Sequence, residues 1–132
     1  MKAVQRSELL ELGQYEEVRE HFRARMIREK QVRRVALGPN MTVLFENHDT
    51  VLYQIQEMLR TERITQEAGV LHELETYNQL IADAGELSAT VFIEYTDREE
   101  RDRMLVALAG VERCFYLEIA GQRGQGRGEV RG

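Results

Sequence analysis

Four polar residues in the middle of the chain have the chemistry of a metal or catalytic site. Glu46 and His48 lie two residues apart, and Gln54 and Glu57 follow within the next nine residues. A loop histidine beside carboxylates could ligate iron, because iron binds both imidazole nitrogen and carboxylate oxygen. The sequence therefore keeps open a metal-binding or catalytic site built from Glu46, His48, Gln54 and Glu57, with His48 and Glu46 as its metal ligands.

The motifs that usually mark a resident metal or cofactor are missing from the sequence. Ferritin-like di-iron bundles place a Glu three residues before a His, but no histidine of this chain has a Glu at that position. No two of His21, His48 and His72 share the spacing of a helical zinc motif either. The glycines before residue 121 are isolated, so no phosphate-binding loop is expected. The lone cysteine, Cys114, opens an apolar segment and is expected to be buried and inert. We therefore expect no cofactor and favour a function that is not enzymatic.

The segment from Arg19 to Arg34 is the strongest charge feature, with seven basic residues against two acidic ones. In one interpretation it binds an anion or a nucleic acid. In the other, its guanidinium groups pair internally with carboxylates and serve as scaffold. The acids expected as partners are Glu46, Glu57, Glu62 and Glu94. We favour internal pairing, because the chain holds 23 acidic against 18 basic residues.

Length and composition predict one globular domain. The chain has 132 residues, of which 42% are hydrophobic and 31% charged, enough for one core. One cysteine excludes an internal disulfide. There is no secretory signal and no run of about 18 apolar residues, so we expect a cytoplasmic protein without a membrane segment. The net charge of −5 makes nucleic-acid binding unlikely over most of the surface.

Hydrophobic periodicity and turn residues divide the chain into eight elements. Helices are expected at about 15–30, 50–63, 65–81 and 97–109, and strands at 35–37, 41–45, 87–95 and 114–119. The strand at 87–95 has the strongest strand signal and is expected to be central. The pattern predicts an α+β fold with a small mixed or antiparallel sheet of about four strands and about four helices. It forms a single domain over residues 1–120, followed by a disordered Gly/Arg-rich tail at 121–132.

Several short segments recur in order along residues 15–120 and carry a resemblance. They are 33–38, 44–47, 50–58, 73–78, 86–90 and 93–95, and the most specific are Phe45 to Asn47 and Tyr53 to Met58. Together they resemble a bacterial family, domain-of-unknown-function family 3501. Its members are often encoded beside rubrerythrin and an iron-sulphur oxidoreductase, so the resemblance implies a role near peroxide or iron handling. Rubrerythrin-like or iron-sulphur redox proteins are the partners that it suggests.

The chain departs from the family at two places. Family members usually continue past the end of this chain, and they tend to have prolines around Asn78 to Ala82, where this chain has none. The resemblance therefore implies a chain shortened at its C-terminus, in which the Gly/Arg tail replaces a further segment.

The resulting hypothesis is a non-enzymatic accessory or interaction domain that serves redox, iron or oxidative-stress handling. It would act through an acidic surface and the polar helix from Tyr53 to Arg60. The candidate polar network consists of Arg33, Arg34, Glu46, Asn47, Tyr53, Gln54, Glu57 and Arg60. The hypothesis predicts that Arg33, Arg34, Glu46 and Glu57 converge in space.

Overall fold

The computed structural model of the protein describes residues 2–128, which fall into two compact units. The first unit ends at Ile93 and the second begins at Glu94. This boundary falls inside the single domain predicted over residues 1–120. Within the described residues, no helix has the length and apolar character needed to cross a membrane.

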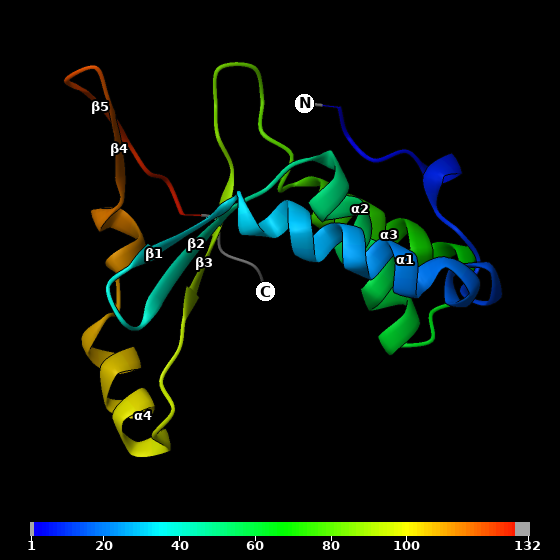
Figure 1. The fold of residues 1–132 in the computed structure, drawn as a ribbon, viewed down its shortest axis with the longest axis horizontal. Helices are drawn as coiled ribbons and strands as arrows, with labels where there is room; N and C mark the ends of the chain where they lie inside the picture. Colours follow the sequence, from blue (N-terminus) through cyan, green and yellow to red (C-terminus); the bar gives the residue numbers. More distant parts are fainter. Residues whose placement is uncertain (1, 129–132) are drawn as a thin grey trace. The chain divides into compact units, whose positions relative to one another are not determined.

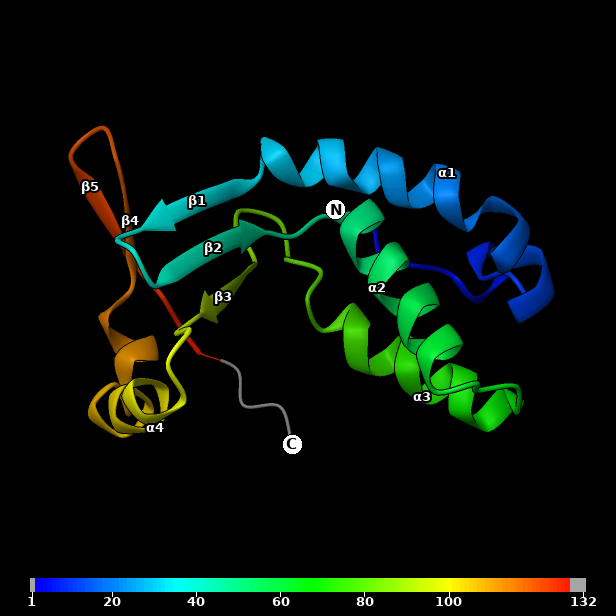
Figure 2. The same ribbon diagram turned by 60° about the horizontal axis from the view of Figure 1, so that its bottom comes forward.

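The first unit contains three α-helices, of which the second packs against both others (Figures 1 and 2). The helices are α1 (Leu12–Gln31), α2 (His48–Thr61) and α3 (Glu67–Asn78). The start of α2 follows from its cap: the Asn47 side chain accepts a hydrogen bond from the Thr50 backbone N–H at 2.8 Å, which satisfies a donor that the first helical turn leaves free. The three helices expected in this part of the sequence are confirmed.

A three-stranded antiparallel sheet completes the first unit. Its strands are β1 (Arg34–Leu37), β2 (Met41–Phe45) and β3 (Ala89–Ile93), in the order β1-β2-β3 (Figure 2). The strands expected at 35–37 and 41–45 are confirmed and pair as a hairpin, in whose turn Gly38 supplies the positive φ of 75°. The prediction that residues 87–95 form a central strand is wrong.

The central strand is β2, whose Val43 and Leu44 are buried. Strand β3 lies at an edge of the sheet, and its Val91 and Phe92 remain 36% and 39% exposed. Apolar composition indicates burial on both faces, but it cannot tell which strand has two neighbours.

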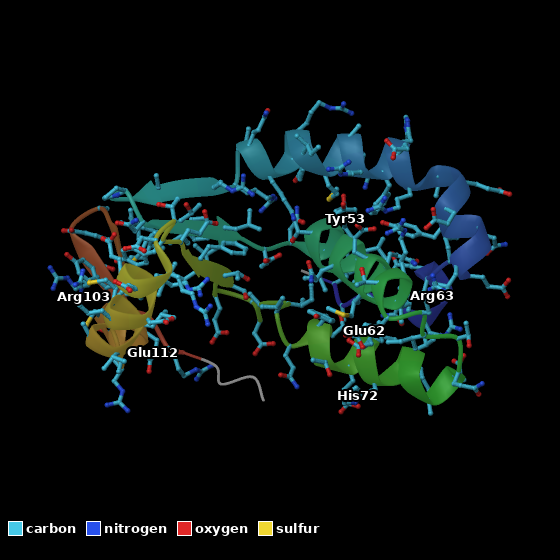
Figure 3. The ribbon with its side chains drawn as sticks, turned by 90° about the horizontal axis from the view of Figure 1, so that it is seen from below. Tyr53, Glu62, Arg63, His72, Arg103 and Glu112 are labelled. Carbon is cyan, nitrogen blue, oxygen red and sulfur yellow. The ribbon has the colours of Figure 1, made fainter. Side chains whose placement is uncertain are left out.

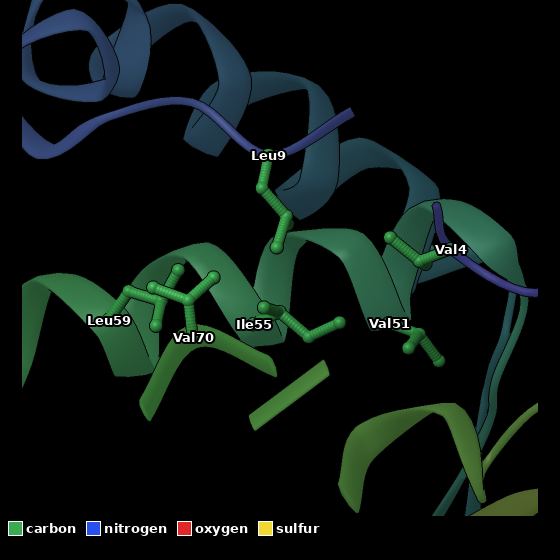
Figure 4. Packing of buried hydrophobic residues seen from close by; sticks show 6 residues of the cluster. All are labelled: Val4, Leu9, Val51, Ile55, Leu59 and Val70. Carbon is green, nitrogen blue, oxygen red and sulfur yellow. The ribbon is translucent and has the colours of Figure 1, made fainter. Parts of the chain in front are cut away.

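The core of the first unit includes a segment before α1, which we call the N-terminal strap (residues 2–11). It contains a short 3-10 helix, η1 (Arg6–Glu8). The strap buries Val4 and Leu9, which are 2% and 7% exposed. Figure 4 shows both side chains directed toward α2, where they join one cluster with Val51, Ile55, Leu59 and Val70.

The second unit consists of a helix and a hairpin. It contains α4 (Arg98–Ala107), the 3-10 helix η2 (Val111–Cys114), β4 (Tyr116–Ile119) and β5 (Gln122–Gln125). Asp97 caps α4, because its carboxylate accepts from the Glu99 N–H at 3.3 Å. Cys114 is exposed at the end of η2, so the prediction of a buried, strand-borne cysteine is wrong. The apolar residues of β4 are exposed, so the apolar composition of a segment does not by itself predict its burial.

Part of the predicted disordered tail is a strand. Strand β5 pairs with β4 through a two-residue turn in which Ala120 and Gly121 have positive φ values of 51° and 81°, as a type I′ turn requires. The Gln125 side chain also donates to the Arg113 carbonyl at 2.8 Å. This backbone ladder needs no apolar side chains, which is why composition missed it. Residues 129–132 of the predicted tail lie outside the described residues.

The α+β fold class is confirmed. Four α-helices accompany two small antiparallel sheets of three and two strands within residues 2–128, where one sheet of about four strands was expected.

Candidate functional site

The side chains that join α1 to α2 form the most extensive polar and aromatic cluster described in the first unit. We call this cluster the α1–α2 seam. Its members are Tyr15, Glu16, Arg19, Phe22 and Lys30 of α1 and Tyr53, Glu57 and Arg60 of α2. In α1, Tyr15, Arg19 and Phe22 follow one another at steps of four and three residues, so they lie on one side of that helix. The same holds for the three members in α2.

Glu57 is the centre of the seam. Its carboxylate accepts a hydrogen bond from the Tyr15 hydroxyl at 2.7 Å and two from the Arg19 guanidinium at 2.8 and 3.0 Å. Arg19, and then the Tyr15 hydroxyl, hold the pKa of Glu57 below its usual range against the opposing effect of burial. Burial and the neighbouring Glu57 raise the pKa of Tyr15. The paired geometry therefore keeps Glu57 ionised and Tyr15 protonated near neutral pH.

Aromatic rings continue the seam beside this carboxylate. Phe22 lies against Tyr53, with 5.5 Å between ring centroids, and the Lys30 ammonium lies 5.3 Å from the centre of the Tyr53 ring. Figure 3 shows Tyr53 on the side of α2 that faces α1. Burial raises the pKa of Tyr53. Tyr53 is therefore a neutral phenol held between an aromatic ring and a cation.

A second network surrounds the buried Glu46, which is 8% exposed. Its carboxylate accepts from the hydroxyls of Thr50 in α2 and Thr90 in β3, at 2.5 and 2.9 Å. Two hydroxyl donors satisfy the carboxylate oxygens without a cation. Glu46 thereby ties the end of β2 to α2 and to β3.

Asn47 extends this second network to α1. Its amide donates to the Glu29 carboxylate at 3.0 Å, and the same oxygen accepts from Arg33 at 2.9 Å. Arg33 lowers the pKa of Glu29, and the Asn47 amide adds to this effect. The network therefore fixes the junction between the end of α1 and the start of α2.

His48 belongs to a third network. Its Nδ1 lies 2.8 Å from the Lys2 carbonyl oxygen and its Nε2 lies 2.7 Å from the Glu8 carboxylate. Both partners are in the N-terminal strap. The histidine therefore holds the strap on the first turn of α2.

The structure distributes the predicted site residues over these three networks. The four proposed metal or catalytic residues do not share one: Glu46 bonds to threonines, His48 to the strap and Glu57 to the seam. Gln54 is half-buried in α2. Among residues 2–128, no group of three or more His, Cys, Asp or Glu side chains is arranged to hold a metal ion.

The predicted convergence of four charged residues is found for one pair only. Arg33 and Glu46 belong to one network through Glu29, Asn47 and Thr50. Glu57 belongs to the seam, and Arg34 lies exposed in β1. Partners between 38 and 46 residues away in sequence, such as Arg19 with Glu57 or Thr90 with Glu46, are chosen by packing and not by local spacing.

Internal pairing of the basic segment holds for three of its seven members. Arg19, Arg25 and Arg33 form ion pairs with Glu57, Asp49 and Glu29. Of the four acids predicted as partners, only Glu57 is among these. Three other members, Arg23, Arg28 and Arg34, are exposed and have no carboxylate within 4.0 Å in the described part of the chain.

Sequence reasoning missed the roles of Tyr15, Glu29, Thr50 and Thr90 as partners of the predicted carboxylates. A signal existed for the first of these. Tyr15 and Arg19 are four residues apart on one predicted helix, so they share a face, and Tyr53 and Glu57 repeat that spacing on another. No such signal exists for Thr50 and Thr90, because α2 and β3 come together at Glu46 only in the folded chain.

The pH dependence of stability tests the role of Glu57. Because its folded pKa is lowered, its contribution is present above the unfolded value of about 4.3 and is lost as pH falls through the folded pKa. We expect Glu57→Gln to lower the free energy of unfolding by about 1–2 kcal/mol at pH 7. The gap to the unsubstituted protein should narrow as pH falls below the unfolded value of about 4.3, as measured by urea unfolding. Glu75→Gln at an exposed position of α3 is the control and should have little effect on stability, and a gap for Glu57→Gln that does not narrow in acid would contradict the assignment.

The chain is similar to a protein family and to a solved structure. The model of the family described as Protein of unknown function (DUF3501) matches residues 3–131. No curated protein matches the chain. A solved structure, described as a novel protein of unknown function from Burkholderia pseudomallei K96243, is similar with 40% sequence identity and a TM-score of 0.79. The similarity covers 83% of this chain and 62% of the other, so this chain spans less than two thirds of that protein. The family match extends over nearly the whole sequence, and the chain belongs to the DUF3501 family.

Proposed function

We propose that this chain is a protein-binding accessory domain, without catalysis of its own, that serves redox or iron handling. The observation that carries the proposal is the use made of the reactive side chains. Glu57, Glu46 and His48 each have both of their polar atoms engaged by other groups of the first unit. A nucleophile or general base needs an atom that can reach a substrate, whereas these atoms hold the fold together.

The α1–α2 seam has the composition of a binding surface. Tyr and Arg are enriched among the residues that contribute most to protein interfaces. Here Tyr53, Arg19 and Arg60 are half-buried and held by ion pairs or ring contacts. Side chains that are already ordered lose less conformational entropy when a partner binds. The seam is therefore a pre-ordered surface on the first unit.

The charge of this region indicates the chemistry of the partner. Arg23 and Arg28 project from α1 without a carboxylate partner among residues 2–128, although the chain as a whole carries a net charge of −5. Exposed guanidinium groups on one helix of an acidic protein attract an acidic patch of a partner. We therefore propose a protein with an acidic surface as the partner. The link to rubrerythrin-like or iron-sulphur redox proteins rests on the family resemblance alone.

Binding of purified proteins tests the proposal. A rubrerythrin-like protein and an iron-sulphur oxidoreductase from a host that encodes this family are titrated by calorimetry with the chain. We expect one of them to bind, and Arg23→Glu combined with Arg28→Glu to weaken that binding by about tenfold or more. The matched control is Arg98→Glu with Arg103→Glu, which makes the same charge change at two exposed positions of α4 in the second unit, also five residues apart.

Two other outcomes would replace the proposal. Stoichiometric iron or zinc in the purified protein, lost with Glu46→Gln or His48→Gln, would favour the metal site. Binding of a nucleic acid at low salt, weakened by the α1 double variant and not by the control, would favour the anion-binding function. Binding of neither redox protein, or equal loss in the two double variants, would reject the accessory role as stated.

A further inference from the structure

We propose that strand β3 is a self-association edge, at which two copies of this chain pair as antiparallel strands about a two-fold axis at Val91. The pairing joins two sheets of three strands into one sheet of six. This contact goes beyond the accessory function proposed above, because it uses none of the residues of the α1–α2 seam. It rests on the direction of the β3 backbone groups and on the composition of the strand.

Alternate residues of β3 direct their backbone groups away from the sheet. The Glu46 N–H donates to the Ser88 carbonyl at 2.9 Å, one residue outside the paired segment of β2 and β3. Antiparallel strands alternate between residue pairs that exchange hydrogen bonds and pairs that do not, so Thr90 and Phe92 are bonded to β2. The residues between them point their N–H and C=O groups to the other side of the strand. These residues are Ala89, Val91 and Ile93.

The outward backbone groups of β3 have no backbone partner among residues 2–128. Strand β3 has β2 as its one neighbour in the sheet (Figure 2). Outside the sheet, no backbone hydrogen bond in this part of the chain involves Ala89, Val91 or Ile93. Unpaired N–H and C=O groups along a strand edge are a template for another strand. The open side of β3 can therefore accept a further strand.

Strand β3 lacks the features that normally prevent pairing at a sheet edge. Its five residues include no charged residue, proline or glycine, and its register with β2 has no bulge. Natural edge strands are usually protected by one of these features. The opposite edge of the sheet, β1, has such protection in the exposed charge of Arg34. Val91 and Phe92 are by contrast 36% and 39% exposed, so β3 is the edge that favours association.

A second copy of β3 satisfies all the outward backbone groups at once. The middle residue of the strand, Val91, is itself an outward residue, so a two-fold axis there pairs it with its own equivalent. The same axis pairs Ala89 of each copy with Ile93 of the other. Three N–H groups from each of two strands then give six hydrogen bonds between the copies. Such a two-fold contact is closed, because each copy uses the same edge.

The charge of the chain also favours this register. Each copy has a net charge of −5, so two copies repel each other unless their contact keeps acidic side chains apart. The paired strands contain no charged residue. Continued by one residue, the register places Glu94 opposite Ser88, and not opposite a second carboxylate. An acidic chain can therefore meet its own copy at this edge.

Pairing also extends an apolar row of the sheet. Val35, Val43 and Val91 lie directly opposite one another on the three strands, so they share one face. The two-fold axis places Val91 of the second copy beside Val91 of the first, and the row continues across six strands. Because a standard protein interface has about ten direct hydrogen bonds, a contact with six should be weak and reversible.

Sedimentation equilibrium of the full chain tests the proposal. We expect a reversible equilibrium of monomer and dimer between about 1 μM and about 1 mM, as for a small interface. Val91→Lys places two ammonium groups opposite each other and should weaken the dimer by about tenfold or more. The matched control is Val35→Lys, which makes the same change at a 47% exposed position of the other edge strand and should leave the dimer unchanged.

A mixture of charge variants tests the register and separates it from misfolding. Val91→Lys and Val91→Glu should each dimerise weakly, whereas an equimolar mixture should form a heterodimer that is tighter by about tenfold or more. The gain is expected because a two-fold axis at residue 91 places the two opposite charges side by side. A variant that had lost its fold could not be rescued by mixing.

Four outcomes would overturn the proposal. A monomer up to about 1 mM would exclude an interface of this strength. Equal weakening by Val35→Lys would show that the copies meet through the sheet face and not through the β3 edge. A mixture without recovery would exclude the axis at Val91, and species larger than a dimer would show an open assembly in which unlike edges pair.

Discussion

Replacing Ile55 with Ala is expected to lower the free energy of unfolding by about 2–5 kcal/mol, since the substitution removes apolar contacts and leaves a cavity. Ile55 has no exposed surface and lies in the cluster that joins α2, α3 and the N-terminal strap (Figure 4). Urea unfolding followed by circular dichroism measures the change. The midpoint should fall with little change in the slope, because the exposed area on unfolding stays nearly the same.

The control for this substitution is Val32→Ala. Val32 follows α1 and is 85% exposed, so its truncation should change the free energy of unfolding by no more than about 0.5 kcal/mol. A loss below 1 kcal/mol for Ile55→Ala would show that the cluster does not hold the helices together. Equal losses for the two variants would lead to the same conclusion.

Replacing Asn78 with Ala is expected to cost about 2–4 kcal/mol, because it leaves both polar groups of a buried residue without their partner. The Asn78 amide accepts from the Val4 N–H at 2.8 Å and donates to the Val4 carbonyl at 3.0 Å, and Val4 is 2% exposed. Thermal and urea unfolding measure the loss. Proteolysis of the N-terminal strap should also become faster, because the strap loses its attachment to the end of α3.

Two matched variants separate the contributions of Asn78. Asn78→Asp keeps an acceptor for the Val4 N–H but loses the donor to its carbonyl, so it should be destabilised as well, with a larger loss at pH 7 than at pH 4, where the carboxyl group can be protonated. Gln79→Ala changes the exposed neighbour and should have little effect. If Asn78→Ala and Gln79→Ala unfold alike, the two-bond attachment of the strap is not a source of stability.

Helices and the first hairpin could be predicted from the sequence because their signals are local. The β1–β2 hairpin follows from two β-prone runs around Gly38, and α2 follows from Asn47 and the apolar spacing of Val51 and Ile55. Capping, turn angles and helical periodicity involve residues at most four apart. Even so, helical spacing alone does not predict burial: Val18 lies at helical spacing from Tyr15 and Phe22 in α1 but is 43% exposed.

The candidate site was predicted less well for a physical reason. Of the eight residues expected in one polar network, Tyr53, Glu57 and Arg60 lie in the α1–α2 seam, whereas Arg33, Glu46 and Asn47 lie in a second network. A charged side chain pairs with the group of opposite charge that packing brings within reach. The chain contains many carboxylates, so the sequence alone does not identify the partner of Arg19. The composition limits how many ion pairs can form but does not determine which residues form them.

The sequence by itself determined the α+β class, the family and the positions of most helices and strands, because periodicity and turn chemistry act over a few residues. Only the tertiary structure decided that the strap completes the core, that β3 is an edge strand and that His48 holds the strap. Each of these contacts joins residues about 40 or more positions apart, such as Val4 with Asn78. Their geometry depends on how the helices pack, and local propensity contains no information about that packing.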